Sequence, residues 1–214
     1  HDTILAEESG LSEGTFDPRL PMEARLMWYI DPLDGTNNFA HGNPYYCVSI
    51  AYGDETGGIY SAAVYQPFTK LMFSADKGEG AYCNGERIKL SSEPKKFEEG
   101  AYSTGWASSK GRELDEIGEN VMRVQKACTS TAVRMNGAAA LDMAFTAWSV
   151  FDGFWERNLN PWDTAAGSLI IEEAGGVGLN EKGERFNCRR DLFVVAGHPS
   201  IVAKLLKLVA RPKS

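Results

Sequence analysis

The segment W-Y-I-D-P-L-D-G-T-N-N-F, residues 28–39, joins an apolar run to two acids. The run L-M-W-Y-I at 26–30 is continuous and apolar, which predicts a strand buried on both faces. Asp31 and Asp34 follow this run, three residues apart, and Pro32 keeps Asp31 in an extended conformation. The two carboxylates can therefore converge on one point at the mouth of the strand.

The oxygen atoms of this turn suit a hard divalent cation. The Leu33 carbonyl lies between the two carboxylates, and Mg²⁺ prefers carboxylates, water and substrate phosphate as ligands. Gly35 supplies a permissive turn, and the Gly35 and Thr36 amides would face an anion if a helix starts there. The alternative interpretation is an Asx turn that closes a buried strand, because Asp and Gly commonly mark turns.

Two further acid sites favour the metal interpretation. Glu7 and Glu8 end an apolar run at 3–7, and Asp163 opens an expected helix within P-W-D-T-A-A-G at 161–167. Taken singly, Glu7 can be a solvated strand end and Asp163 a helix N-cap. Taken together, unpaired carboxylates at close range repel one another, and metal ions remove that penalty and create a site for phosphoryl transfer.

Composition excludes several classes of protein. The chain has 214 residues, of which 43% are hydrophobic and 24% charged, so intrinsic disorder is excluded as the main state. The net charge of −7 argues against binding to nucleic acid or to an anionic membrane surface. No apolar run is long enough to span a membrane. The four cysteines are scattered along the chain, at Cys47, Cys83, Cys128 and Cys188. This spacing argues against a zinc cluster and indicates a reducing, cytoplasmic setting.

The order of elements predicts one folded unit over residues 1–214 with two unlike halves. The first half, 1–100, is rich in strands, and the second half, 101–214, alternates strands with helices, which predicts layered α/β packing. The expected strands lie at 48–52, 58–65, 71–75, 80–83, 151–156 and 192–196, and the expected helices at 110–125, 137–148, 163–174 and 201–209.

The segments 31–39 and 162–167 resemble the two signature motifs of the inositol monophosphatase family of metal-dependent sugar phosphatases. Weaker matches run through 42–51, 82–89, 103–105 and 134–141, so the resemblance covers nearly the whole chain. It implies a mixed α+β and α/β fold, a layered α-β-α-β-α sandwich, and a homodimer. Family members carry two long helices ahead of this region, which we expect to be absent from this chain.

The resemblance also implies roles for individual residues. Thr36 and Glu7 are the expected catalytic residues, Thr36 by orienting the attacking water, and the Gly35 and Thr36 amides would hold the phosphate. Substrate contacts are expected at Ala139 and Glu156, with Arg157 as a counter-charge to Glu156. Two or three Mg²⁺ ions would be held by Glu7, Asp31, the Leu33 carbonyl, Asp34 and Asp163.

The activity implied is Mg²⁺-dependent hydrolysis of a phosphate monoester of inositol or a related sugar, inhibited by Li⁺. Fructose-1,6-bisphosphatase, or an enzyme acting on both substrates, is the alternative within the class. F-W-E at 154–156 resembles the inositol type more than a nucleotide 3′-phosphatase or a histidinol phosphatase. A different class, a non-catalytic regulatory binding protein of the same fold, also stays open. Asp142, within an apolar helix, is as consistent with a buried structural acid as with a substrate contact.

Overall fold

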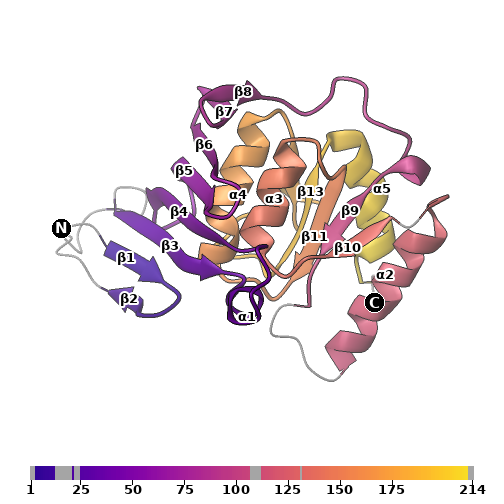
Figure 1. The fold of residues 1–214 in the computed structure, drawn as a ribbon, viewed down its shortest axis with the longest axis horizontal. Coiled ribbons are helices and arrows are strands. Elements are labelled where there is room, and N and C mark those ends of the chain that lie inside the picture. Colours follow the sequence, from indigo (N-terminus) through magenta and orange to yellow (C-terminus); the bar gives the residue numbers. More distant parts are fainter. Residues whose placement is uncertain (1–2, 13–20, 22–24, 107–111, 131, 212–214) are drawn as a thin grey trace.

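The computed structural model describes residues 3–12, 21, 25–106, 112–130 and 132–211, which form two mixed β-sheets with helices between and beside them (Figure 1). In these residues no helix is long and apolar enough to cross a membrane. All four cysteines are free. The mixed α/β class and the layered packing expected from the sequence are confirmed.

The first sheet has eight strands in the order β2-β1-β3-β4-β5-β6-β7-β8. Only β1 and β3 are parallel, so their carboxyl ends lie at the same edge of the sheet. The other neighbours are antiparallel, and β7 and β8 are joined by the N-G turn at 84–85, where both residues have positive φ. The strands are β1 Thr3–Ala6, β2 Gly10–Ser12, β3 Leu26–Asp34, β4 Cys47–Asp54, β5 Ile59–Gln66, β6 Leu71–Asp76, β7 Gly80–Cys83 and β8 Glu86–Ile88.

The second sheet has five strands in the order β10-β9-β11-β13-β12. Its strands are β9 Tyr102–Thr104, β10 Val133–Met135, β11 Gly153–Arg157, β12 Val177–Leu179 and β13 Phe193–Gly197. The central strands β11 and β13 are buried along their whole length, because helices pack on both of their faces. The helices of the chain are α1 Thr36–Ala40, the 3-10 helix η2 Phe97–Glu99, α2 Arg112–Lys126, α3 Ala139–Ala147, α4 Pro161–Glu173 and α5 Pro199–Val209.

Two buried helices, α3 and α4, lie between the sheets and contact both of them (Figure 1). These helices carry apolar residues on all of their faces, as is typical of helices that are covered on all sides. The amphipathic helices α2 and α5 pack together on the other face of the second sheet.

The structure corrects one prediction about β3. A strand at 26–30 is present, but its expected burial on both faces is wrong, because burial alternates along it. Met27 and Tyr29 are buried, whereas Leu26 and Trp28 are 39% and 36% exposed. The buried side chains point toward α4, and the exposed ones lie on the outer face. The sequence pattern missed the short strands β2, β8, β9, β10 and β12.

Close packing of α3 against α4 leads to a stability prediction. An added Cβ at Gly167 of α4 would lie 2.6 Å from the Cβ of Met143 on α3, so Gly167→Ala forces the helices apart. We expect urea unfolding to show that the free energy of unfolding falls by about 1–3 kcal/mol.

The matched control is the same substitution at Gly118 of α2, where an added Cβ meets no atom within 4 Å. Gly118→Ala should stabilise the protein by roughly 0.5–1 kcal/mol, because Ala loses less conformational entropy in a helix than Gly. Equal effects at the two positions would contradict the packing described for α3 and α4.

Candidate metal and phosphate site

Three segments carry the four acidic side chains of the site: the end of β1, the end of β3 and the first turn of α4. Ala6 of β1 pairs with Ile30 of β3, so Glu7 and Asp31, the next residues in the two segments, lie at the same edge. The strand β3 continues to Asp34 and then turns into α1 (Figure 1). The first turn of α4 is joined to β4 by a hydrogen bond from Ser49 Oγ to the Trp162 carbonyl, at 3.3 Å.

Asp34 is buried at the N-terminus of α3. Its Oδ2 accepts a hydrogen bond from the Ala140 amide at 2.8 Å and lies 3.6 Å from the Cys47 thiol. Amides at a helix N-terminus favour a negative charge, yet burial, followed by repulsion from Asp163, raises the pKa of Asp34 to about 7. The hydrogen bonds from the chain therefore stabilise the negative charge of Asp34 less than burial and repulsion destabilise it.

Asp31 has the most perturbed carboxylate at the site. Its Oδ1 accepts a hydrogen bond from the Leu33 amide at 2.9 Å, which is the Asx turn considered as the alternative. Burial, and next repulsion from Asp34, raises the pKa of Asp31 to about 8. The turn and the acid pair are thus both present, and one does not exclude the other.

Asp163 has a structural role in addition to the expected one. It is the third residue of α4, and its Oδ2 accepts a hydrogen bond from the Asn160 amide at 2.7 Å. Burial is the main cause that raises the pKa of Asp163 to about 6, and Glu7 adds repulsion. Glu7 itself is exposed, and its amide donates to the Ile30 carbonyl at 3.2 Å.

These oxygen atoms fit Mg²⁺ as partial ligands. In the described part of the chain, no group of three or more His, Cys, Asp or Glu side chains is arranged as a metal cage. Mg²⁺ seldom uses such a cage, since it binds one or two carboxylates together with water and substrate phosphate. A carboxylate has about four acceptor sites, so the bonds made by Asp31, Asp34 and Asp163 leave acceptor capacity on each.

The turn at Gly35 and Thr36 has the conformation that the sequence predicted. Gly35 has a φ of 90°, and an added Cβ would lie 3.0 Å from the Tyr45 carbonyl and 3.2 Å from the Ala138 Cβ, so only glycine fits. Helix α1 begins at Thr36, and the Thr36 hydroxyl donates to the Leu33 carbonyl at 2.9 Å. The hydroxyl is therefore held in place while its oxygen can still accept a hydrogen bond.

The two candidate substrate residues lie on different elements. Ala139 is the first residue of α3, and Glu156 is a buried residue of β11, where it lies against Gly105 so closely that a Cβ there would collide with its carboxylate. The expected counter-charge from Arg157 is wrong. Arg157 follows Glu156 on a strand, so it points to the opposite face, where it pairs with Glu181 at 2.6 Å.

A buried hydrogen-bond network beside the site was not found from the sequence. Asp142 accepts hydrogen bonds from the Tyr45 hydroxyl and, at 2.8 Å, from the Asn136 side chain, so it is bonded as a structural acid. Burial raises the pKa of Asp142 to about 7. The Asn38 side chain donates to the Tyr45 and Asn136 carbonyls at 2.7 Å each. These contacts join distant segments, and no local sequence pattern indicates them.

Comparison with known proteins gives relatives that match between 81% and 98% of this chain. It is 38% identical over 180 residues to the inositol-1-monophosphatase of Caulobacter vibrioides, which covers 81% of this chain and 64% of the relative. It is 36% identical over 210 residues to the putative Nus factor SuhB of Neisseria meningitidis serogroup A, which covers 98% of this chain and 76% of the relative. The chain therefore spans about two thirds to three quarters of these relatives.

Solved structures agree with these sequence matches. The extragenic suppressor protein suhB of Bartonella henselae superposes with a TM-score of 0.86 at 32% identity, covering 99% of this chain and 77% of that one. A structure described as an IMPase/NADP phosphatase complexed with NADP and Ca²⁺ superposes with a TM-score of 0.76 at 27% identity. The match covers 96% of this chain and 73% of that one. The model of the inositol monophosphatase family matches residues 1–213, and the chain belongs to this family.

Proposed function

We propose that the protein hydrolyses a phosphate monoester of inositol or a related sugar in a reaction that depends on Mg²⁺. The observation that carries the proposal is a set of three carboxylates whose pKa values are all raised, namely buried Asp31 and Asp34 and half-buried Asp163. Among the described residues none of the three is ion-paired with Lys, Arg or His. A relative named inositol-1-monophosphatase and a homologue with bound Ca²⁺ support this choice.

The residues proposed to hold Mg²⁺ are Glu7, Asp31, the Leu33 carbonyl, Asp34 and Asp163. When bound, Mg²⁺ supplies positive charge that offsets the carboxylates and the phosphate and makes a nearby water a better nucleophile. The chain contributes position: Asp31 is fixed by the Leu33 amide and Asp34 by the Ala140 amide. Two fixed carboxylates lower the reorganisation needed during the reaction.

The turn at Gly35 and Thr36 is proposed to hold the phosphate and to orient the attacking water. Since the Thr36 hydroxyl donates its proton to the Leu33 carbonyl, its oxygen can accept a hydrogen bond from a water molecule. The backbone amides of Gly35 and Thr36 are the proposed donors to the phosphate oxygens. Glu7, at the exposed edge beside Asp31, completes the proposed catalytic set.

Specificity is proposed to depend on Glu156 and the backbone at Ala139. A carboxylate accepts hydrogen bonds from sugar hydroxyls, whereas it repels a second phosphate. Arg157, the next residue on β11, is directed to the other face, where it pairs with Glu181. This favours a monophosphate over fructose 1,6-bisphosphate.

A second candidate function is a regulatory role without turnover. Relatives from Neisseria meningitidis and Pseudomonas aeruginosa carry the names putative Nus factor SuhB and Nus factor SuhB. A phosphate-release assay with and without Mg²⁺ separates the two candidates, because a non-catalytic protein releases no phosphate in either condition.

The first functional prediction concerns Asp34. We expect Asp34→Asn to lower phosphate release from inositol 1-phosphate by more than about a hundredfold at saturating Mg²⁺, because a ligand charge is lost. The exposed Asp76 at the end of β6 provides the control, and Asp76→Asn should keep wild-type turnover. Substantial activity in Asp34→Asn would rule out the proposed site.

The second functional prediction concerns Glu156. Glu156→Gln keeps the side-chain shape but removes the charge, so kcat/KM for inositol 1-phosphate should fall by roughly 1–3 kcal/mol, the range for a charge-assisted hydrogen bond. Hydrolysis of an aryl phosphate, which has no hydroxyls to bind, should hardly change. Equal losses for the two substrates would show that Glu156 is structural.

The third prediction concerns stability without metal. The pKa values of Asp163, Asp34 and Asp31 are about 6, 7 and 8 and lie above the ordinary value near 4. Between pH ~4 and these values, the folded state therefore binds more protons than the unfolded state. Their stabilising contribution is complete below pH ~4 and is lost progressively as pH rises from about 4 through the folded pKa values of about 6, 7 and 8. The melting temperature in EDTA should therefore fall across this interval.

The same measurement on Asp34→Asn isolates one of these groups. Its amide oxygen can still accept the Ala140 hydrogen bond but carries no charge, so the variant should be more stable than wild type by about 1–3 kcal/mol at alkaline pH without metal. Asp76→Asn should follow the wild-type curve. Parallel curves for wild type and Asp34→Asn would contradict the electrostatic account of the cluster.

A further inference from the structure

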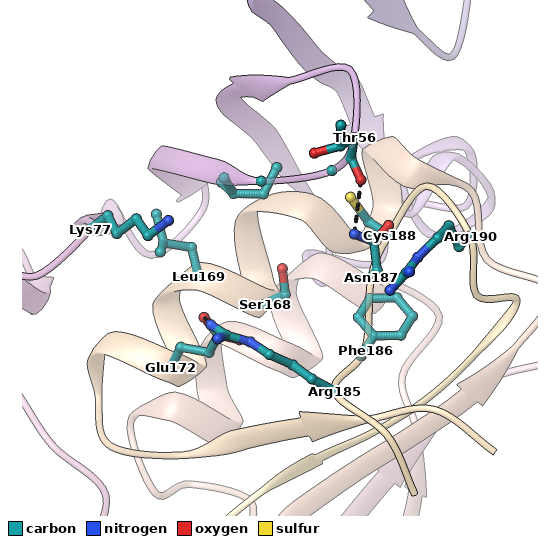
Figure 2. Close-up of a pocket in the computed structure, with 13 residues that line it drawn as sticks. Thr56, Lys77, Ser168, Leu169, Glu172, Arg185, Phe186, Asn187, Cys188 and Arg190 are labelled. Carbon is teal, nitrogen blue, oxygen red and sulfur yellow. Dashed lines mark hydrogen bonds and ion pairs between the residues drawn. The ribbon is translucent and has the colours of Figure 1, made fainter. Parts of the chain in front are cut away.

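A cavity of about 280 Å³ opens between the turns that join β4 to β5 and β6 to β7, the second half of α4 and the loop at 185–190 (Figure 2). None of the proposed catalytic, metal or substrate residues lines it. Its polar lining residues come from four regions of the chain: Thr56, Lys77, Ser168, Glu172, Arg185, Asn187, Cys188 and Arg190.

The charge of this lining is opposite to that of the whole chain. Lys77, Arg185 and Arg190 carry positive charge and Glu172 alone carries negative charge, so the lining has a net charge of +2 in a chain of −7. Arg185 is bound to Glu172 through its Nε at 2.9 Å, which neutralises that pair. The surplus charge therefore belongs to Lys77 and Arg190.

The two surplus cations have no acidic partner in the described part of the chain. Lys77 Nζ lies 5.3 Å from the centre of the Tyr60 ring, a contact that holds the ammonium without neutralising it. Figure 2 shows Lys77 and Arg190 on opposite sides of the cavity, with Ser168 and Leu169 of α4 between them. Two cations that face one cavity from opposite sides suit a ligand with two negative charges.

The walls of the cavity are held by contacts between its regions. The Asn187 side chain donates to the Thr56 carbonyl at 2.9 Å, which joins the loop to the β4–β5 turn. Burial raises the pKa of Cys188 to about 12, so its thiol stays neutral and adds no negative charge. The positive lining thus belongs to a fixed cavity between four segments of the fold.

We propose that this cavity binds a small dianion that carries a phosphate group. A Lys ammonium and an Arg guanidinium are the two side chains that proteins use to bind phosphate. A volume of about 280 Å³ accommodates a phosphate with a few attached atoms, but it is small for a nucleotide. The proposal stands independently of the phosphatase activity, since the two sites share only the helix α4.

Titration of inorganic phosphate into metal-free protein tests this proposal. Without metal the acidic cluster repels anions, so phosphate binding in EDTA, measured by calorimetry at low salt and mildly alkaline pH, reports the cavity. We expect one site, and chemical-shift changes at the amides of Gly57 and Ser168. Combining Lys77→Gln with Arg190→Gln should weaken the affinity by at least about tenfold.

Lys207→Gln is the matched control, because this exposed lysine of α5 lies outside the cavity. The affinity of this variant for phosphate should stay at the wild-type value. Each single variant, Lys77→Gln and Arg190→Gln, should show an intermediate loss, which guards against misfolding of the double variant. Absence of phosphate binding, an unchanged affinity in the double variant, or shifts confined to Gly35 and Thr36 would overturn the proposal.

Discussion

The buried hydrogen bond from the Ala140 amide to Asp34 Oδ2 is the contact on which the site depends. It joins the end of β3 in the first sheet to the first turn of α3, and its length is 2.8 Å. The same carboxylate is repelled by Asp163 at the start of α4, so one residue connects the first sheet with both central helices. The amide of a helix N-terminus fixes a charge that burial would otherwise exclude. Position is thus obtained at an electrostatic cost, and a bound cation would remove that cost.

Local patterns in the sequence were enough to find the acids, and the reason is physical. Asp31 and Asp34 follow an apolar strand directly, and Asp163 opens a helix, so each is placed by its own element. The exposure of Trp28 could not be found in this way, because it depends on what packs against the outer face of the sheet. The network of Asn38 and Asp142 depends on tertiary contacts. The direction of Arg157, in contrast, follows from strand alternation and was available from the sequence.

The helix α4 separates two regions of opposite charge. Its first turn holds Asp163 within the acid cluster, and its second half lines a cavity with surplus positive charge. At a rise of ~1.5 Å per residue, Asp163 and Glu172 are about 14 Å apart along the helix axis, beyond a Debye length at physiological salt. Each region therefore keeps its own electrostatic character, although the chain as a whole is acidic. A net charge alone would have hidden this division.

The long sequence separation of the contacts around Asp34 also bears on how the protein folds. Asp34 and Ala140 are 106 positions apart, and Asn38 and Asn136 are 98 apart. The entropy of closing such loops is lost before the contacts form, so nonlocal pairing is slow. During synthesis, a nascent chain that ends before Ala140 has β3 and its acids but no helix N-terminus to fix them. The geometry of the site is therefore completed late, when the two halves of the chain dock, and its appearance reports that folding is complete.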